Sequence, residues 1–179
     1  TIVCVTPNPA LDRTLGVPGF AAGGVWRATG CRTACGGKGI NVARALARLG
    51  RTTLSVGPLG GRTGQEGAAA TAAEGLAARW TAIGGETRTC LLIVDDRGQS
   101  TVVNEPGPQI TLAEWSAFAS AVVHAAEQAQ AVCIGGSLPP GCHVHLQRQA
   151  REQVLGSLRR LVQQSWRRLR TELQTYAAL

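Results

Sequence analysis

A glycine-rich stretch with one lysine, residues 35–41 (Cys-Gly-Gly-Lys-Gly-Ile-Asn), lies directly before a segment with helical periodicity. Glycines let the backbone approach a ligand closely, and the first amides of a helix favour an anion. Lys38 adds a full positive charge and is the only lysine among the 18 basic residues. The G-x-x-x-x-G-K-[ST] spacing of a Walker A loop is absent. The stretch predicts an anion-binding loop, and an exposed glycine-rich turn is the alternative.

Two further loops with polar side chains each follow a short apolar run. The first, residues 7–12 (Pro-Asn-Pro-Ala-Leu-Asp), ends in Asp12, whose carboxylate can accept hydrogen bonds from two sugar hydroxyls or stabilise a turn. The second, residues 135–139 (Gly-Gly-Ser-Leu-Pro), offers backbone amides and the hydroxyl of Ser137. In parallel sheets, ligands bind at the carboxyl ends of the strands. We therefore expect these two loops and the lysine loop to converge on one site.

The elements expected to position these loops alternate between strands and helices. Apolar runs predict buried strands at residues 2–6, 52–56, 80–83 and 131–134. Helices are predicted at residues 39–49, 63–79 and 111–128, the last opened by a Thr-x-x-Glu capping box at residues 111–114. Strands that are apolar on both faces and alternate with helices predict a parallel α/β sheet with crossover helices.

More polar strands do not fit into that sheet. Residues 88–94 and 100–104 flank a glycine-containing turn and predict a hairpin. The segments 14–17 and 25–33 predict short, half-exposed strands. Together these segments predict a small, separate antiparallel layer.

Length and charge set the remaining limits. The 179 residues suit a single domain, and no apolar run approaches the roughly 18–20 residues needed to span a bilayer. Of the net charge of +7, residues 143–179 carry +5 (seven Arg, two Glu) and the remainder only +2 (eleven basic, nine acidic), so basicity belongs to the tail. The tail predicts an amphipathic helix with a solvated basic face, and RNA or membrane contact is the weaker alternative. Nucleic-acid binding is thus not expected of the main body.

The cysteine and histidine content predicts neither disulfides nor a metal site. Six cysteines are present, several of them inside apolar runs, and the chain is large enough to fold without disulfides, so we expect reduced thiols. The first residues lack the basic region of a signal peptide, and we expect a cytoplasmic location.

Several motifs occur in one order along the chain. They are T-P-N-P-A-L-D (6–12), G-G-K-G-I-N-V-A-R-A-L (36–46), G-P-L-G-G-R-T-G (57–64), T-R-T (87–89), V-N-E-P-G-P (103–108) and G-G-S-L-P-P-G (135–141). In this order and spacing the chain resembles the phosphofructokinase B group of ribokinase-like sugar kinases, most closely its 1-phosphofructokinase and tagatose-6-phosphate kinase branch. The resemblance implies that residues 1–142 form the N-terminal half of a ribokinase-like domain, a Rossmann-like parallel-sheet core with a small antiparallel β lid. Residues 143–179 do not resemble the family.

The resemblance also implies how a phosphorylated ketohexose is held. Asp12 and Asn41 would bind sugar hydroxyls, and Gly37 would allow the backbone to approach. Lys38 and Arg88 would bind the phosphate already on the sugar. Two cations suit a dianionic phosphate, while carboxylate and amide groups suit hydroxyls.

Three further residues receive roles from the resemblance alone. Arg27 would help at the phosphate, Asn104 would lie on the lid over the substrate, and Ser137 would lie near the transferring phosphoryl group. ATP and Mg²⁺ would be the cofactors, and the lid is a candidate homodimer interface.

The family's catalytic motif, G-A-G-D, is not found in this sequence, and no Asp follows Asp96. Members of the family are about twice as long, so we expect the general base to lie outside this chain and assign no catalytic residue within it. The function implied is ATP-dependent phosphorylation of a phosphorylated ketohexose, with this chain holding mainly the sugar-phosphate site. The alternative is a catalytically inactive sugar-phosphate-binding or regulatory module.

Overall fold

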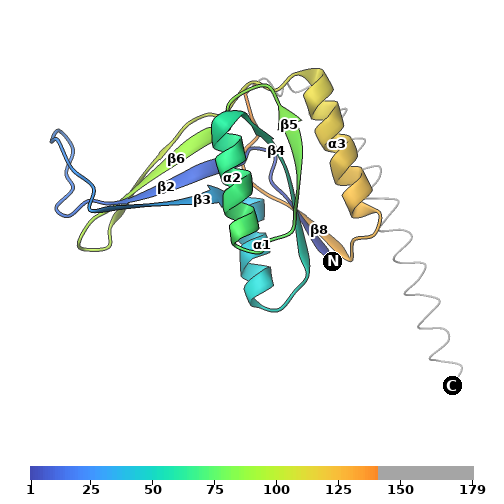
Figure 1. Cartoon of the computed structure of the whole chain (residues 1–179), viewed down its shortest axis with the longest axis horizontal. Coiled ribbons are helices and arrows are strands. Elements are labelled where there is room, and N and C mark those ends of the chain that lie inside the picture. Colours follow the sequence, from blue (N-terminus) through green and yellow to red (C-terminus); the bar gives the residue numbers. More distant parts are fainter. Residues whose placement is uncertain (141–179) are drawn as a thin grey trace, which may run out of the picture.

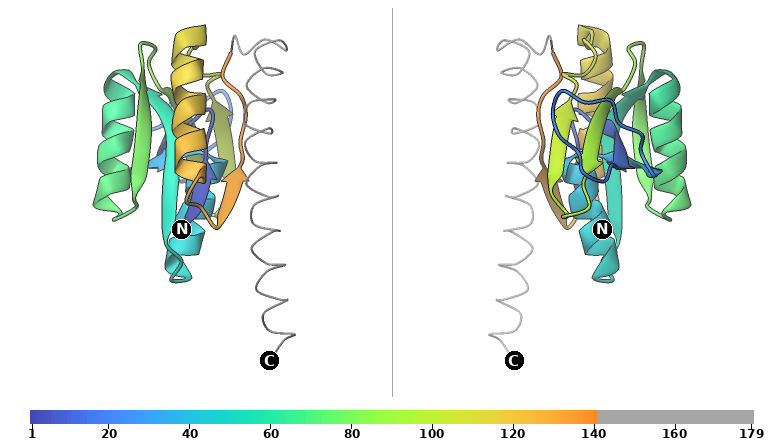
Figure 2. Two further views of the ribbon diagram at one scale, coloured as in Figure 1. Left: turned by 90° about the vertical axis from the view of Figure 1, so that its right-hand side faces the viewer. Right: turned by 90° about the vertical axis from the view of Figure 1, so that its left-hand side faces the viewer.

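The computed structural model describes residues 1–140, which form three layers with a parallel sheet in the middle (Figure 1). The strand order is β5 (Ala78–Ile83), β4 (Thr53–Gly60), β1 (Ile2–Val5) and β8 (Ala131–Ile134), and every neighbouring pair is parallel. One face is covered by α1 (Lys38–Arg48) and α2 (Gly61–Ala73), and the other by α3 (Leu112–Ala126), as Figure 2 also shows. The predicted parallel α/β core is confirmed, whereas the predicted tail helix lies outside the described residues.

The apolar core lies between the sheet and α3. The buried side chains packed there are Val3, Val5, Val56, Ile83, Ile110, Trp115, Phe118 and Val122. The rings of Trp115 and Phe118 meet edge to face with centroids 5.5 Å apart. The predicted capping box is present, because the Thr111 hydroxyl accepts the Glu114 N–H and the Glu114 carboxylate accepts the Thr111 N–H. The apolar face of α3 packs the helix against the sheet, and the capping box sets where the helix begins.

A second four-stranded sheet, which we call the lid, projects to one side of the core and faces the viewer on the right of Figure 2. Its order is β3 (Gly30–Gly36), β2 (Ala10–Gly16), β6 (Arg88–Val94) and β7 (Ser100–Asn104). The pair β6–β7 is antiparallel, as the hairpin signal predicted, and the pair β2–β3 is antiparallel as well. The central pair β2–β6 is parallel, so the prediction of a purely antiparallel layer was wrong. The lid is therefore a mixed sheet.

The register of the lid aligns functional side chains in one row. Asp12 on β2 lies opposite Cys90 on β6, and Cys90 lies opposite Asn104 on β7. Because residues paired across a sheet point to the same face, these three side chains share one surface. The next row on that face contains Leu92 and Val102.

Several elements differ from their predicted bounds, among them β3, which covers Gly30–Gly36 instead of residues 25–33. For three others the physical reason is clear. The strand β2 starts at Ala10 rather than Thr14, which moves Asp12 from a loop into a strand. The strand β4 continues through Pro58 to Gly60. The pairing with β1 ends at Val56, so no hydrogen bond on that side is lost because Pro58 lacks an N–H. The helix α2 ends at Ala73 rather than Arg79, because Gly75, with a φ of 71°, forms a Schellman turn.

The cysteines within residues 1–140 are all free thiols, and each of them lies in a strand, as was predicted for Cys4, Cys90 and Cys133. Burial raises the pKa of Cys4, with a further contribution from Cys133 on the neighbouring strand. In the same part of the chain, no helix is long and apolar enough to cross a membrane.

Candidate functional site

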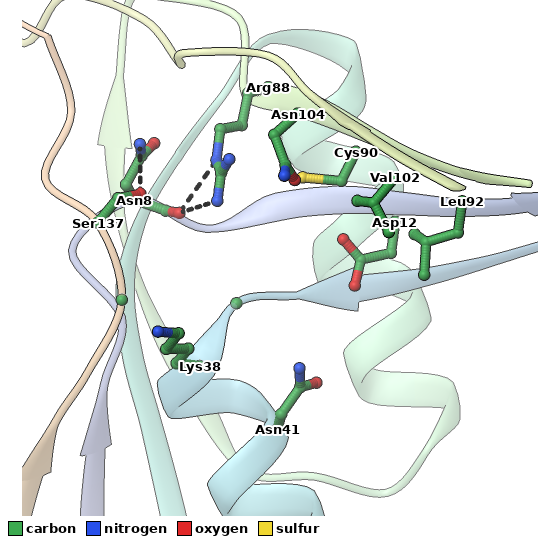
Figure 3. A pocket seen from close by; sticks show the side chains of 12 residues that line it. Asn8, Asp12, Lys38, Asn41, Arg88, Cys90, Leu92, Val102, Asn104 and Ser137 are labelled. Atoms are coloured by element: carbon green, nitrogen blue, oxygen red, sulfur yellow. Dashed lines mark hydrogen bonds between the residues drawn. The ribbon is translucent and has the colours of Figure 1, made fainter. Parts of the chain in front are cut away.

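A cleft of about 430 Å³ lies between the N-terminus of α1 and the lid (Figure 3). This volume falls in the range of small-molecule sites. It is lined by Asn8, Asp12, Gly37, Lys38, Asn41, Arg88, Cys90, Leu92, Val102, Asn104, Gly136 and Ser137. The structure thus brings together seven of the eight residues predicted from the sequence. The eighth, Arg27, lies outside the cleft in the exposed connection between β2 and β3.

Glycines bring the start of α1 against the end of β1. Gly37, the N-cap, has a φ of 124°, and a Cβ on it would lie 2.5 Å from the methyl group of Thr6. Thr6 is fully buried, and its hydroxyl accepts the N–H of Ile40 in the first helical turn (3.0 Å). A side chain directly after β1 therefore caps α1 in place of an N-cap side chain, and the helix is held with its first turn at the cleft.

The loop after β8 covers this helix N-terminus. A Cβ on Gly135 would lie 3.4 Å from Cβ of Lys38, and one on Gly136 would lie 3.9 Å from the Lys38 amide nitrogen. The Lys38 side chain is exposed and forms no hydrogen bond or ion pair with any other residue between 1 and 140. Its ammonium group is therefore free to meet an anion at a position that the dipole of α1 also favours.

Asn8 joins three loops of the site, and the sequence analysis did not single it out. Its side chain is 3% exposed, and its amide nitrogen lies within hydrogen-bond distance of the Pro106 carbonyl (3.0 Å), the Ser137 hydroxyl (3.2 Å) and the Leu138 carbonyl (3.4 Å). These partners lie 98 to 130 residues away along the chain. The signal available in the sequence was an asparagine held between two prolines directly after a strand.

Arg88 is the first residue of β6, and backbone carbonyls orient its side chain. Its guanidinium donates to the carbonyl of Asn8 (3.2 and 3.3 Å) and to the carbonyl of Glu105 (3.1 Å), as Figure 3 shows for Asn8. A guanidinium has five N–H donors, so donors remain for a ligand. Among residues 1–140 the partners of this guanidinium are neutral carbonyls, which hold its charge at the edge of the cleft.

Asp12 lies in a partly desolvated position on the lid. A Cβ on Gly36 would overlap its carboxylate, so the glycine provides the space that Asp12 occupies. Burial raises the pKa of Asp12 above its usual value, although the charges of Arg88 and Arg44 and a hydrogen bond from Cys90 oppose this effect. The carboxylate is thus kept in an environment that favours hydrogen-bond donors, such as hydroxyls.

The pKa shift predicts a pH-dependent gain in stability for Asp12→Asn. Because burial raises the pKa of Asp12, the folded chain binds this proton more tightly than the unfolded chain, and stability falls as the pH rises through the interval above the usual value. An asparagine does not titrate, so we expect the variant to be more stable than the natural chain at pH 7 and to lose this advantage near pH 4. Thermal unfolding at several pH values measures the difference. A variant less stable at pH 7 would show that Arg44 and Arg88 outweigh burial.

The groups around the cleft can bind an anion and several hydroxyls. Lys38 and Arg88 supply positive charge, while Asp12, Asn41 and Asn104 supply hydrogen-bond acceptors and donors. Within residues 1–140 there is no group of three His, Cys, Asp or Glu side chains that could hold a metal ion. The chemistry of the groups around the cleft therefore suits an anionic polyol.

Solved structures of sugar kinases resemble the chain. Phosphofructokinase-2 from Escherichia coli, solved in complex with fructose-6-phosphate, is 28% identical with a TM-score of 0.80, covering 87% of this chain and 52% of its own. A protein from Thermotoga maritima described as a possible 1-phosphofructokinase is 28% identical with a TM-score of 0.78, covering 87% of this chain and 51% of its own. The chain thus spans about half the length of these proteins.

The family comparison covers most of the sequence. The model of the pfkB family carbohydrate kinases matches residues 9–172, a range that crosses the predicted boundary at residue 142, and the division of the chain there stays a prediction. The fold agrees, since the two solved structures match 87% of this chain with TM-scores of 0.80 and 0.78. The match and the shared fold show that the chain belongs to the pfkB family of carbohydrate kinases.

Proposed function

We propose that the chain binds a phosphorylated ketohexose and forms the sugar-phosphate site of an ATP-dependent kinase. The observation that carries this proposal is the joint presence, in one cleft, of two cations and of several hydroxyl-binding groups. Lys38 and Arg88 would bind the phosphate, and Asp12, Asn41 and Asn104 the hydroxyls. Gly37 would let the backbone approach the sugar, and Ser137 would lie near the transferring phosphoryl group.

The relatives support a fructose-like ligand. Phosphofructokinase-2 from Escherichia coli was solved in complex with fructose-6-phosphate, and the relative from Thermotoga maritima is described as a possible 1-phosphofructokinase. The sequence motifs favour the 1-phosphofructokinase and tagatose-6-phosphate kinase branch within the family. Fructose-1-phosphate, fructose-6-phosphate and tagatose-6-phosphate are therefore the three ligands to compare.

ATP would supply the phosphoryl group, and Mg²⁺ would reach the site bound to the nucleotide. The carboxylates of residues 1–140 form no metal site, and Mg²⁺ in kinases is commonly held through substrate phosphates. Asp12 is the sole acidic side chain among the cleft residues, and we assign it to hydroxyl binding. A general base contributes about 10²- to 10⁴-fold to such a reaction, so we expect the 179-residue chain to bind sugar phosphate without measurable turnover.

Isothermal titration calorimetry of the 179-residue chain tests the binding proposal. We expect at least one of the three ketohexose phosphates to bind more tightly than fructose and than inorganic phosphate, because each of these controls lacks one half of the contacts. A coupled assay with ATP and Mg²⁺ then separates a kinase from a regulatory binding module. If none of the three ligands binds, the proposed function is wrong.

The lid also supports the proposed homodimer. β7 is an edge strand with all five residues exposed, and Val102 and Val103 are 49% and 56% exposed. An exposed edge strand is a template for pairing with another chain. Phosphofructokinase-2 from Escherichia coli was solved as a tetramer in an inhibited form. Light scattering coupled to size-exclusion chromatography would detect a dimer of the present chain, and a monomer at all concentrations would exclude it.

A further inference from the structure

Arg44 lies one turn beyond Asn41 on α1 and contacts this cleft residue from outside the cleft. Its Nη1 donates to Oδ1 of Asn41 (2.6 Å), and its Nη2 donates to the carbonyl of Cys35 (2.9 Å). The same guanidinium forms an ion pair with Glu74, at the C-cap of α2. Arg44 does not line the cleft, and its side chain is 21% exposed. One side chain therefore links both helices of this face and the end of β3.

The contact with Arg44 decides which end of the Asn41 carboxamide faces the cleft. A guanidinium carries donors only, so it binds the carboxamide oxygen and repels the NH₂ group. With Oδ1 held by Arg44, the Nδ2 group is left for the cleft, as Figure 3 shows. If the carboxamide rotated by half a turn, donors would face donors, and this hydrogen bond would be lost. Asn41 is thereby fixed as a hydrogen-bond donor.

Glu74 holds Arg44 in the orientation that this contact needs. The hydrogen bond and charge of Arg44 lower the pKa of the Glu74 carboxyl below its usual value, so Glu74 is ionised at neutral pH. Both carboxylate oxygens accept from Arg44, a paired geometry that restrains a guanidinium more than a single contact would. The rotamer of Arg44 is thus set before a ligand arrives.

Arg44 also reaches the backbone beside the second hydroxyl-binding group. The carbonyl of Cys35 that it binds belongs to the peptide joining Cys35 to Gly36, and the Asp12 carboxylate lies directly over Gly36. Asp12 accepts hydrogen bonds, whereas Asn41 donates them. The two residues therefore present complementary groups to neighbouring hydroxyls. Arg44 binds the Asn41 side chain directly and binds the backbone next to Gly36, over which Asp12 lies.

We propose that Arg44, held by Glu74, is a positioning residue that fixes Asn41 as a donor toward a sugar hydroxyl. The inference rests on the proposed function, because it concerns the hydroxyl-binding part of the sugar-phosphate site. If Arg44 acts through Asn41, replacing Arg44 should have no effect on sugar-phosphate affinity once the Asn41 carboxamide is gone. The phosphate-binding part of the site does not depend on it.

A double-mutant cycle in the 179-residue chain tests this coupling. We compare Arg44→Met, Asn41→Ala and the double variant by calorimetry with the ketohexose phosphate that binds most tightly to the natural chain. Arg44→Met keeps the length of the side chain and removes its donors. We expect it to weaken binding about 3- to 10-fold, the equivalent of one hydrogen bond, and less than twofold when Asn41 is already alanine.

Two controls separate positioning from a general loss of stability. Binding of inorganic phosphate, followed by NMR titration, depends on Lys38 and Arg88 and should change less than twofold in Arg44→Met. Arg13→Met removes another arginine ion pair, Arg13–Glu66 (3.3 Å), away from the cleft, and should leave sugar-phosphate affinity unchanged. If Arg44→Met does not fold, Arg44→Lys, which keeps the charge but lacks the planar fork of guanidinium donors, is measured in the same cycle. Its loss of affinity should likewise disappear in the Asn41→Ala background.

The outcomes distinguish this inference from the proposed function. Equal losses from the Arg44 change with and without Asn41, or an equal loss of inorganic phosphate binding, would overturn the positioning role while the sugar-phosphate site stands. If the natural chain binds none of the ketohexose phosphates, the proposed function fails and this inference fails with it.

Discussion

Replacing Lys38 with alanine is expected to weaken binding of a ketohexose phosphate about 10- to 100-fold, which corresponds to roughly 1.5–3 kcal/mol, the range for hydrogen bonds to charged groups. The effect is large because the ammonium group is exposed and has no partner within residues 1–140, so its charge is available to the ligand. Stability should not fall. The first turn of α1 contains no acidic residue, and a positive charge at a helix N-terminus is unfavourable by about 0.3–1 kcal/mol.

Calorimetry together with thermal unfolding checks both parts of this prediction. Arg48→Ala is the matched control, because it removes the same charge from the other end of the same helix, about 15 Å away. Arg88→Ala is expected to weaken binding by a similar amount, but it also removes the hydrogen bonds to Asn8 and Glu105. Unchanged affinity in Lys38→Ala would rule out the phosphate contact, and an equal loss in Arg48→Ala would indicate only a long-range charge effect.

Replacing Gly39 with alanine is expected to lower the free energy of unfolding by about 2 kcal/mol. A Cβ at this position would overlap the backbone carbonyl oxygen of Val5 and lie 2.5 Å from the Thr6 hydroxyl, and both residues are buried in β1 or at its end. Overpacking of this kind costs about 1–3 kcal/mol, and separating α1 from β1 also breaks the hydrogen bond from Ile40 to Thr6. The better helix propensity of alanine returns only about 1 kcal/mol. The steric cost therefore decides the sign.

Urea unfolding of Gly39→Ala beside Gly30→Ala measures this effect against a control. Gly30 lies at the start of β3, and a Cβ there would meet no atom within 4 Å. The control should therefore be as stable as the natural chain or slightly more stable. If Gly39→Ala proved as stable as Gly30→Ala, the close approach of α1 to β1 would be wrong, and with it the position of Lys38.

The sequence predicts those elements whose signals are local. The hairpin of β6 and β7 and the start of α3 agree with the structure, because a glycine turn and a capping box each act within a few residues. The start of β2 was misplaced, because this strand carries Asp12 and Arg13 and has no apolar alternation at its beginning. Its parallel partner β6 lies more than seventy residues away, and periodicity contains no information about such a pairing.

In the candidate site too, residues with a local sequence signal could be predicted, whereas residues whose role depends on tertiary contacts could not. Lys38 and Asp12 could be predicted because a charged residue beside glycines, or soon after an apolar run, is a signal that a few neighbouring residues carry. Asn8 was missed because its role consists of contacts with two distant loops, which only the folded chain brings together. Arg27 was assigned to the phosphate from resemblance alone, and the fold places it in an exposed connection with no link to the cleft. Its contribution stays a prediction.

The row of Asp12, Cys90 and Asn104 across the lid makes the site depend on strand length more than on most single side chains. Inserting or deleting one residue within β2, β6 or β7 would turn every following side chain to the opposite face, so that Arg13 or Leu91 would replace a cleft residue. The turn at residues 95–99 and the connection at residues 17–29 lie beyond the row, where added residues leave the register intact. Insertions and deletions compatible with the site should therefore be confined to these two segments, and an alignment with a gap inside a lid strand would mark a chain whose cleft binds something else.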